Sequence, residues 1–207
     1  MRQCILHIIR HGQTDWNAEK RLQGHIDIPL NERGKAEAEI IAEEFKNHAL
    51  GAIYSSPLQR AHTTAQIINR HHAHDIKTHD ALKEATYGPY EGWTVEEYHA
   101  KGGETLASLK LRPLRERLHF KIAAEAESYY EVYQRVKPLL DQIIDIHLGE
   151  EVLIVSHGRL MGALIAMVAG DDIHDIQIEN IGRLTLAGNK SGLVMQGHKR
   201  IMIKRAS

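Results

Sequence analysis

Two short runs of apolar residues constrain the fold of this chain most strongly. Residues 4–9 form a nearly continuous apolar run, and residues 152–155 form a second one. A strand that is apolar along its whole length belongs in a sheet that is covered on both faces. Apolar residues also recur at helical spacing over residues 32–47 and 128–147. This alternation of strands and helices predicts an α/β fold with a largely parallel sheet and helices on both of its faces.

The chain length and the remaining patterns set the domain organisation. A length of 207 residues fits a single domain, residues 1–207, or one core with an elaborated cap. Residues 85–126 are the least regular part, and we expect them to form a cap or insertion over the site. Pro138 lies inside the helix expected at residues 128–147 and predicts a kink there. The other expected elements are a strand at 52–54, a helix opened by Pro57, a helix at 159–169, and two strands at about 183–188 and 192–198.

The composition argues against several classes of partner. A formal net charge of −1 gives no electrostatic reason to expect nucleic acid or an anionic membrane surface. No stretch of the sequence approaches the roughly 20 apolar residues of a membrane span, so we expect no membrane partner. The one cysteine, Cys4, rules out an internal disulfide and makes the reducing cytoplasm the default location.

Charged and polar residues follow the expected strands directly. Arg10, His11 and Gly12 come after the first apolar run, and His157 and Gly158 follow Ser156 at the end of the run at 152–155. Ligands of open α/β sheets bind outside the carboxyl ends of the strands. Arg60 falls in the first turn of the helix opened by Pro57, where free N–H groups favour anions. Two arginines and two histidines at one edge of a sheet predict a site for phosphoryl transfer.

Longer motifs surround these residues. They are RHGQTDWN at residues 10–17, RLQGHIDIPL at 21–30, YSSPLQRA at 54–61, Glu84 with Tyr90-Glu91-Gly92, and VSHG at 155–158. With them the chain resembles the histidine phosphatase superfamily, in the branch of cofactor-dependent phosphoglycerate mutases and their small phosphatase relatives. The resemblance covers about residues 5–92 and 127–170, whereas residues 93–126 match poorly. It implies a three-layer α/β sandwich, with a mostly parallel central sheet of about six strands, one edge strand antiparallel, flanked by helices.

The resemblance also implies a role for each candidate residue. His11 is expected to be the nucleophile that becomes phosphohistidine, and Glu84 to protonate the leaving oxygen and then activate water. Some members of the superfamily place an aspartate directly after the second histidine, but this chain has Gly158 there, which favours Glu84. The expected catalytic residues are His11, Glu84, Arg10, Arg60 and His157. The expected phosphate-binding residues are Arg10, Asn17, Gln23, Gly24, Arg60, His157 and Gly158.

Hydrolysis of a small phosphorylated metabolite is the favoured activity. Dedicated glycolytic mutases of this branch carry a larger basic insertion and a basic-aromatic motif after the position of Glu84, where this chain has Ala85, Thr86 and Tyr87. A cofactor-dependent phosphoglycerate mutase is the alternative, and a catalytically inactive phosphate-binding module is a third reading. Sugar phosphates, a substrate like fructose 2,6-bisphosphate and a phosphorylated cobalamin precursor stay open as substrates.

The expected cofactors and partners follow from this chemistry. No metal or other cofactor is expected for hydrolysis, because the arginines supply the positive charge; 2,3-bisphosphoglycerate would serve only a mutase. His71, His72, His74 and His79 lie close in the sequence, and a solvated surface at a helix end is favoured over a metal site there. Exposed edge strands allow a homodimer without requiring one.

Overall fold

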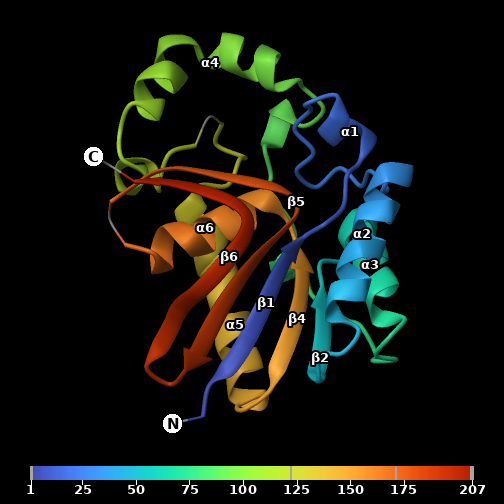
Figure 1. Ribbon diagram of the computed structural model, residues 1–207. Helices are drawn as coiled ribbons and strands as arrows, with labels where there is room; N and C mark the ends of the chain where they lie inside the picture. The colour runs from blue at the N-terminus through green and yellow to red at the C-terminus, as the bar shows by residue number, and fades with distance from the viewer. Residues whose placement is uncertain (1, 122, 171, 206–207) are drawn as a thin grey trace.

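The computed structural model describes residues 2–121, 123–170 and 172–205, and its centre is one six-stranded sheet between two layers of helices (Figure 1). The strand order is β3-β2-β4-β1-β5-β6. The strands are β1 (Cys4–Arg10), β2 (Leu50–Ser55), β3 (Lys77–Thr78), β4 (Glu151–Ser156), β5 (Ile173–Asn189) and β6 (Gly192–Arg205).

The two apolar runs form the central strands of this sheet. β1 and β4 are parallel neighbours, and their register places Arg10 opposite Ser156. β2 and β3 extend the parallel part beyond β4, whereas β5 is antiparallel to β1 and the edge strand β6 is antiparallel to β5. The expected mostly parallel sheet with an antiparallel edge is therefore confirmed.

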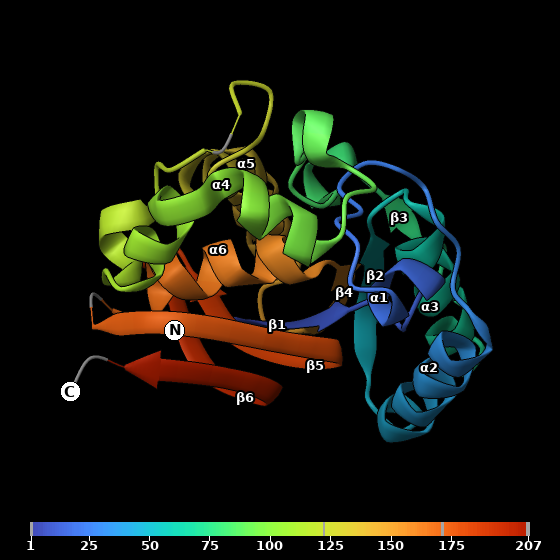
Figure 2. The ribbon, with the colours of Figure 1, turned by 90° about the horizontal axis from the view of Figure 1, so that it is seen from above.

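Helices cover both faces of the sheet, as Figures 1 and 2 show. Side chains alternate along a strand, so β4 contributes Leu153 and Val155 to one apolar cluster and Val152 and Ile154 to another. α2 and α3 pack on the first cluster, and α5 and α6 pack on the second, which makes the three expected layers. The helices are α1 (Asp15–Ala18), α2 (Glu32–Phe45), α3 (Gln59–Asn69), α4 (Val95–Lys110), α5 (Tyr129–Ile146) and α6 (Gly158–Val168), with short 3-10 turns η1 (Asp80–Leu82), η2 (Gly88–Tyr90) and η3 (Leu114–Arg117).

The longest helix, α5, begins at a capping box. The Ser128 hydroxyl accepts a hydrogen bond from the backbone N–H of Glu131, and the Glu131 carboxylate accepts one from the backbone N–H of Ser128. Pro138 lies inside α5, which remains one helix through this position. The kink expected at Pro138 therefore stays a prediction.

The last two strands are much longer than the sequence predicted. The expected strands at 183–188 and 192–198 are only parts of β5 and β6, so the predicted bounds were wrong. The register of the pair shifts between Ile178 and Arg183, and Ile181 has a positive φ of 60°. Such an irregularity interrupts the two-residue alternation on which recognition of a strand depends.

The segment 85–126 contains η2, α4 and η3, and α4 lies above the end of the sheet where β1 and β4 finish (Figure 1). The structure does not test whether this segment works as a cap, so that function stays a prediction.

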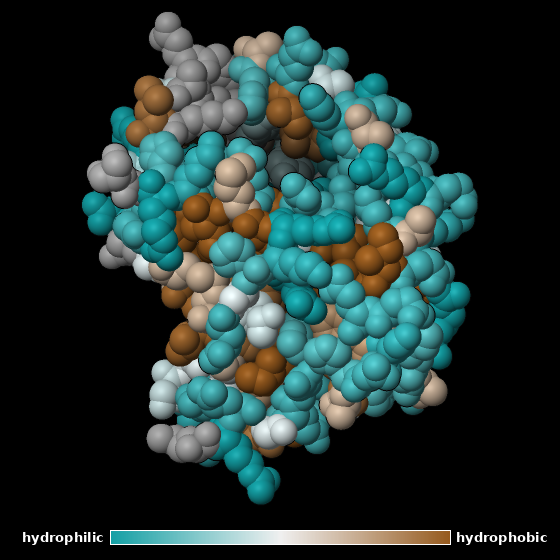
Figure 3. Space-filling view, in the orientation of Figure 1, coloured by the Kyte–Doolittle hydropathy of each residue, from teal (hydrophilic) through white to brown (hydrophobic). Residues whose placement is uncertain are grey.

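The part of the described surface that is visible in Figure 3 carries no large continuous apolar region. In the view of Figure 3, hydrophilic side chains separate the apolar ones into isolated patches. Within the described residues, we find no helix whose length and apolar character would suffice to cross a bilayer.

A close contact between two glycines fixes the loop that follows β1. A Cβ atom on Gly12 would lie 2.3 Å from the carbonyl oxygen of Gly34, and one on Gly34 would lie 2.0 Å from the carbonyl oxygen of Gln13. The backbone N–H of Gln13 also donates to the carboxylate of Glu37 on α2. The loop that carries His11 and Gly12 therefore rests directly on the first turn of α2.

We predict that Gly34→Ala destabilises the protein by about 1–3 kcal/mol, because the new methyl group must push the backbone of Gln13 away. Helix propensity alone would predict the opposite sign, since alanine is favoured over glycine in a helix by about 0.5–1 kcal/mol. Urea unfolding measures the difference. The matched control is Gly197→Ala on β6, where a Cβ atom meets nothing within 4 Å. Equal stability of the two variants would show that the contact does not constrain the loop.

Candidate active site

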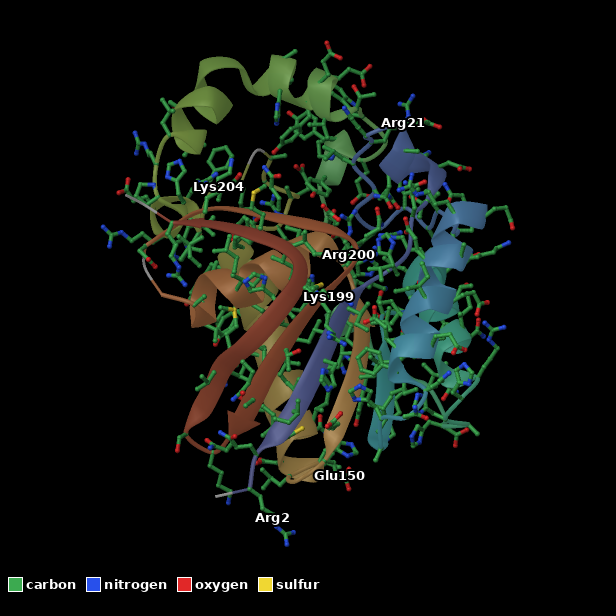
Figure 4. The ribbon with its side chains drawn as sticks, in the orientation of Figure 1. Arg2, Arg21, Glu150, Lys199, Arg200 and Lys204 are labelled. Carbon is green, nitrogen blue, oxygen red and sulfur yellow. The ribbon has the colours of Figure 1, made fainter. Side chains whose placement is uncertain are left out.

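The candidate residues gather at the carboxyl end of the parallel strands, the end onto which Figure 2 looks. Arg10 is the last residue of β1, and His157 follows β4 and caps α6. The backbone N–H of His11 donates to the carbonyl of Ser156 at 3.0 Å, which joins the two strand ends. Figure 4 shows Arg21 at this end of the molecule, whereas Arg2 and Glu150 lie at the opposite end.

Two neighbouring cavities define the site. The smaller one has a volume of about 90 Å³ and the larger one about 230 Å³. Arg10, Glu84 and Tyr87 line both, so the two cavities adjoin. The smaller cavity is also lined by His11, Asn17, Arg21, Leu22, Gln23, Gly24 and Arg60. The larger one is also lined by Tyr129, Gly158, Arg159, Gly162, Ile176 and Ile178.

His11 is held in one tautomer. Its Nδ1 atom lies 2.7 Å from the carbonyl oxygen of Gly12, and a carbonyl only accepts, so Nδ1 carries the proton. The lone pair therefore lies on Nε2. Burial, and then the charges of Arg60 and Arg10, hold the pKa of His11 well below its ordinary value. A neutral imidazole with a free Nε2 is the state that a nucleophilic histidine needs.

His157 lies beside His11 with its ring centre 5.1 Å away. Its side chain is fully buried, and within the described residues neither ring nitrogen has a hydrogen-bond partner. Burial, followed by the charges of Arg60, His11 and Arg10, lowers its pKa well below the ordinary value. A buried polar group without a partner is costly, so a ligand that bonds to His157 would be stabilised strongly.

The two arginines are anchored by backbone carbonyls. Arg10 donates from Nη1 to the carbonyl of Ile178 at 2.6 Å. Arg60 donates from Nη1 to the carbonyl of Ile26 at 2.9 Å and from Nη2 to that of Gly24 at 2.8 Å. Burial lowers the pKa of both groups, but a guanidinium stays charged at neutral pH. The Nε atoms of both are buried without a partner among the described residues, which leaves these N–H donors for an anion.

Asn17 combines a structural role with an orientation suited to binding. Its Oδ1 accepts from the backbone N–H of Thr14 at 3.1 Å and from Nδ2 of Asn180 at 3.2 Å. The side chain thus completes the capping box of α1. Because these donors occupy Oδ1, the amide group of Asn17 offers Nδ2 to a ligand in the smaller cavity.

Glu84 sits against the start of α6. Its Oε1 accepts from the backbone N–H groups of Ala85, Arg159 and Leu160 at 3.0, 3.1 and 3.2 Å. Among the described residues, Oε2 accepts a single hydrogen bond, from the backbone N–H of Arg159 at 3.2 Å. The carboxyl group is therefore fixed through Oε1, and Oε2 is the oxygen better able to exchange a proton in the cavities.

Gln23, Gly24 and Gly158 complete the set of expected residues. Gln23 is 7% exposed, and its buried Oε1 has no hydrogen-bond partner in the described structure. Gly24 contributes the carbonyl that holds Arg60, and Gly158 lines the larger cavity beside Arg10, where a Cβ atom would lie 3.5 Å from Nε. All of the expected residues thus lie at this end of the sheet, and their functional roles remain predictions.

The sequence analysis missed the residues that support this set. Thr64 accepts from the N–H of Gly12 at 3.2 Å and donates to the carbonyl of Arg60 at 2.7 Å. Its position one helical turn after Arg60 could have indicated it. Asn180 donates from Nδ2 to the carbonyl of His11 at 3.1 Å, and no sequence pattern marks it because it comes from the irregular part of β5.

Two further residues hold the loops of the site. Glu91 accepts from the backbone of His25 at 3.0 Å and from the hydroxyl of Thr86 at 2.9 Å, which joins the loop of Gly24 to the segment after Glu84. Arg135 on α5 donates to the carbonyl of Ala81 at 2.8 Å and pairs with Glu127. Glu91 falls within a quoted motif, but its bracing role becomes visible only in three dimensions.

The histidine cluster in the sequence does not share one centre. His74 bonds to the carbonyl of Leu50, and His79 accepts from the backbone of Ala81. Among the described residues, three potential metal-ligating groups lie close together at a different place, where Glu151 accepts from both His7 and His48. This cluster involves β1 and the first residue of β4, away from the strand ends that carry the site.

Comparison with known proteins identifies the family. The model of the histidine phosphatase superfamily (branch 1) matches residues 6–198. Phosphoserine phosphatase 1 of Hydrogenobacter thermophilus is 33% identical over 166 residues, which are 80% of this chain and 76% of the relative. Phosphoglycerate mutase-like protein 4 of Arabidopsis thaliana is 33% identical over 159 residues, which are 76% of this chain and 67% of the relative.

A solved structure agrees with these relatives. The phosphoserine phosphatase of Entamoeba histolytica, in complex with 3-phosphoglyceric acid, superposes with a TM-score of 0.79 and 26% identity, over 95% of this chain and 96% of that one. Since the family model spans nearly the whole chain and the fold agrees, the protein belongs to the histidine phosphatase superfamily, branch 1.

Proposed function

We propose that this protein hydrolyses small phosphomonoesters through a phosphohistidine formed on His11. The observation that carries the proposal is the hydrogen bond from His11 Nδ1 to the carbonyl of Gly12, which leaves Nε2 unprotonated at a cavity lined by Arg10 and Arg60. A cavity of about 90 Å³ fits a phosphoryl group, and the larger one beside it offers room for the rest of a small substrate.

In the first step, Nε2 of His11 attacks the phosphorus atom and the bond to the ester oxygen breaks. The leaving oxygen takes a proton from the carboxyl group of Glu84, which lines both cavities. Arg10, Arg60 and His157 donate hydrogen bonds to the phosphoryl oxygens, where charge is concentrated in the transition state. The products of this step are a free alcohol and phosphohistidine.

In the second step, a water molecule attacks the phosphorus atom in line with Nε2. Glu84 takes the proton from the water, the bond between nitrogen and phosphorus breaks, and inorganic phosphate leaves. His11 returns to its neutral state and Glu84 to its protonated one, so the net reaction is ester plus water giving alcohol plus phosphate.

Hydrolysis is favoured over mutase activity by the surroundings of Glu84. The residues that follow it are Ala85, which is fully buried, and then Thr86 and Tyr87. These side chains bring no positive charge to retain a phosphorylated intermediate. Relatives named as phosphatases support the same choice, and the relative named as mutase-like keeps phosphoglycerate mutase as the second candidate.

We further propose that the hydrolase needs no metal or organic cofactor, because the two anchored guanidinium groups already face the phosphate with positive charge. A mutase would require 2,3-bisphosphoglycerate. Cytoplasmic location and a homodimer, for which the edge strand β6 offers a surface, are part of the same proposal.

The test of the function is turnover of p-nitrophenyl phosphate and a panel of phosphorylated metabolites. We expect the intact protein to release phosphate, with activity unchanged by EDTA, and His11→Ala to lose at least about 10³-fold in kcat, because removal of a covalent nucleophile abolishes the two-step route. The matched control is His198→Ala, at an exposed position on β6. Phosphate release without any phosphohistidine in the 31P NMR spectrum of alkali-quenched enzyme would sink the mechanism. Interconversion of 3- and 2-phosphoglycerate that depends on 2,3-bisphosphoglycerate would identify a mutase instead.

We predict that Glu84→Gln slows hydrolysis to an extent that depends on how strongly the leaving group needs a proton. An alkyl ester such as glycerol 3-phosphate needs a proton on its leaving oxygen, whereas p-nitrophenolate leaves without one. The loss in the first step should be about 10²–10⁴-fold for the alkyl ester and much smaller for p-nitrophenyl phosphate. Single-turnover release of the alcohol measures this step separately from attack by water. Equal losses on both esters would exclude Glu84 as the general acid.

We predict that the stability of the protein depends on pH through the two site histidines. The pKa of His11 and of His157 is lowered in the folded state, while the unfolded chain protonates both below about pH 6.5. Between that value and the lowered folded pKa, the unfolded state binds more protons, so the free energy of unfolding falls as the pH falls from 7 to 5. Urea unfolding of His11→Asn and His157→Asn should show a flatter pH dependence than the parent protein, and His198→Asn the parent's slope. Parallel curves for all four proteins would contradict the low pKa values.

A further inference from the structure

One charged side chain in the larger cavity has no role in the proposed reaction. Arg159 comes two residues after His157, and its guanidinium carbon lies 4.6 Å from the centre of the Tyr129 ring and 5.5 Å from that of Tyr87. Its Nε is buried and, within the described part of the chain, has no hydrogen-bond partner. The ion pairs found among the described residues do not include Arg159 either. The carboxylate of Glu84 lines the same cavity and acts on this charge from a distance, without a direct ion pair to the guanidinium.

The backbone around Arg159 is fixed independently of its side chain. The N–H groups of Arg159 and Leu160 donate to Glu84, which pins the first turn of α6. A Cβ atom at Gly162 would lie 2.9 Å from Cε1 of Tyr129, so the glycine one turn along α6 gives this ring the room to reach Arg159. The guanidinium thus lies over two tyrosine rings, and these contacts do not occupy its N–H donors, so the donors are available to a ligand.

The position of the larger cavity relates Arg159 to the leaving group. Glu84 lines both cavities and is the expected proton donor to the ester oxygen. A substrate with its phosphoryl group beside His11 therefore places the rest of the leaving alcohol past Glu84, in the cavity of about 230 Å³ that Arg159 lines. Ile176 and Ile178 form an apolar part of the wall of this cavity, opposite in character to the charged side chains of Arg10, Glu84 and Arg159.

The charges of the site favour a second anionic group on the substrate. Arg10 and Arg60 suffice to face a phosphate dianion, and Arg159 adds a third positive charge. Withdrawing an unpaired guanidinium from water is unfavourable, and contact with aromatic rings offsets only part of that unfavourable free energy. A carboxylate offers two coplanar oxygens that match the planar fork of a guanidinium.

We propose that Arg159 is a specificity-determining residue that binds a carboxylate on the leaving alcohol, so that the preferred substrates are small phosphomonoesters of hydroxy acids. This inference deepens the proposed function and rests on it for the position of the phosphoryl group. Tyr87 and Tyr129 act as positioning residues that hold the guanidinium where it can contact the substrate's carboxylate.

The test compares two esters that differ at the relevant group. 3-Phosphoglycerate carries a carboxylate where glycerol 3-phosphate carries a neutral hydroxymethyl group. We expect the intact protein to hydrolyse 3-phosphoglycerate with a kcat/KM at least about 10-fold higher, and Arg159→Gln to lose that preference while its activity on glycerol 3-phosphate and p-nitrophenyl phosphate changes less than about threefold. Arg159→Lys should retain part of the preference, because lysine keeps the charge without the fork. Arg112→Gln, at an exposed position, is the matched control.

The ratio of the two kcat/KM values decides the proposal. A ratio near one in the intact protein, or an unchanged ratio in Arg159→Gln, would overturn it; if Arg159→Gln is too inactive to measure, the same criterion applies to Arg159→Lys. Calorimetric binding of 3-phosphoglycerate and glycerol 3-phosphate to His11→Ala gives a readout without turnover. Absence of turnover of every ester by the intact protein would refute the proposed function. Even then, the carboxylate subsite would be supported if His11→Ala binds 3-phosphoglycerate more tightly than glycerol 3-phosphate and the double variant with Arg159→Gln does not.

Discussion

The site depends on the hydrogen bond between Nδ1 of His11 and the carbonyl of Gly12. It determines which nitrogen carries the proton, and so whether the ring can attack phosphorus at all. Gly12 is in turn held by Thr64, whose hydroxyl accepts from its N–H and donates to the carbonyl of Arg60. His11, the proposed nucleophile, and Arg60, a proposed phosphate-binding residue, are therefore linked through a continuous set of hydrogen bonds between β1 and α3. The close contact of Gly12 with Gly34 adds α2 as a third support.

Much of the fold, and the gathering of the candidate residues at one end of the sheet, can be predicted from the sequence, for identifiable reasons. The runs that became β1 and β4 are apolar on both faces, and chemistry at the carboxyl ends of parallel strands follows from topology. β5 and β6 were predicted too short because the bulge near Ile181 breaks the alternation of side chains. A local pattern extends over a few residues, so it cannot describe a strand whose two parts have different registers.

The supporting residues were not predictable in the same way, because each acts across a long separation in the chain. Asn180 bonds to the carbonyl of His11, and Arg135 bonds to the carbonyls of the segment that ends at Glu84. A backbone carbonyl is present at every residue, so a side chain that bonds to one needs no particular residue type as its partner. No sequence motif of paired residue types therefore predicts such a hydrogen bond. Glu91 is intermediate, since it falls in a family motif but its bonds to His25 and Thr86 appear only in the folded chain.

The arginines of this site are held in two ways, and each way suits a different function: stabilising charge on the phosphoryl group, or recognising the leaving alcohol. Arg10 donates to the carbonyl of Ile178, and Arg60 donates to the carbonyls of Gly24 and Ile26. These hydrogen bonds fix the two guanidinium groups before a phosphate binds. Such preorganisation favours catalysis, because little reorganisation is needed as charge develops on the phosphoryl oxygens. Arg159 lies over the faces of two aromatic rings, contacts that do not occupy its N–H donors. A group placed in this way is suited to recognising a planar anion, and its position beyond Glu84 separates selection of the leaving alcohol from the chemistry on phosphorus.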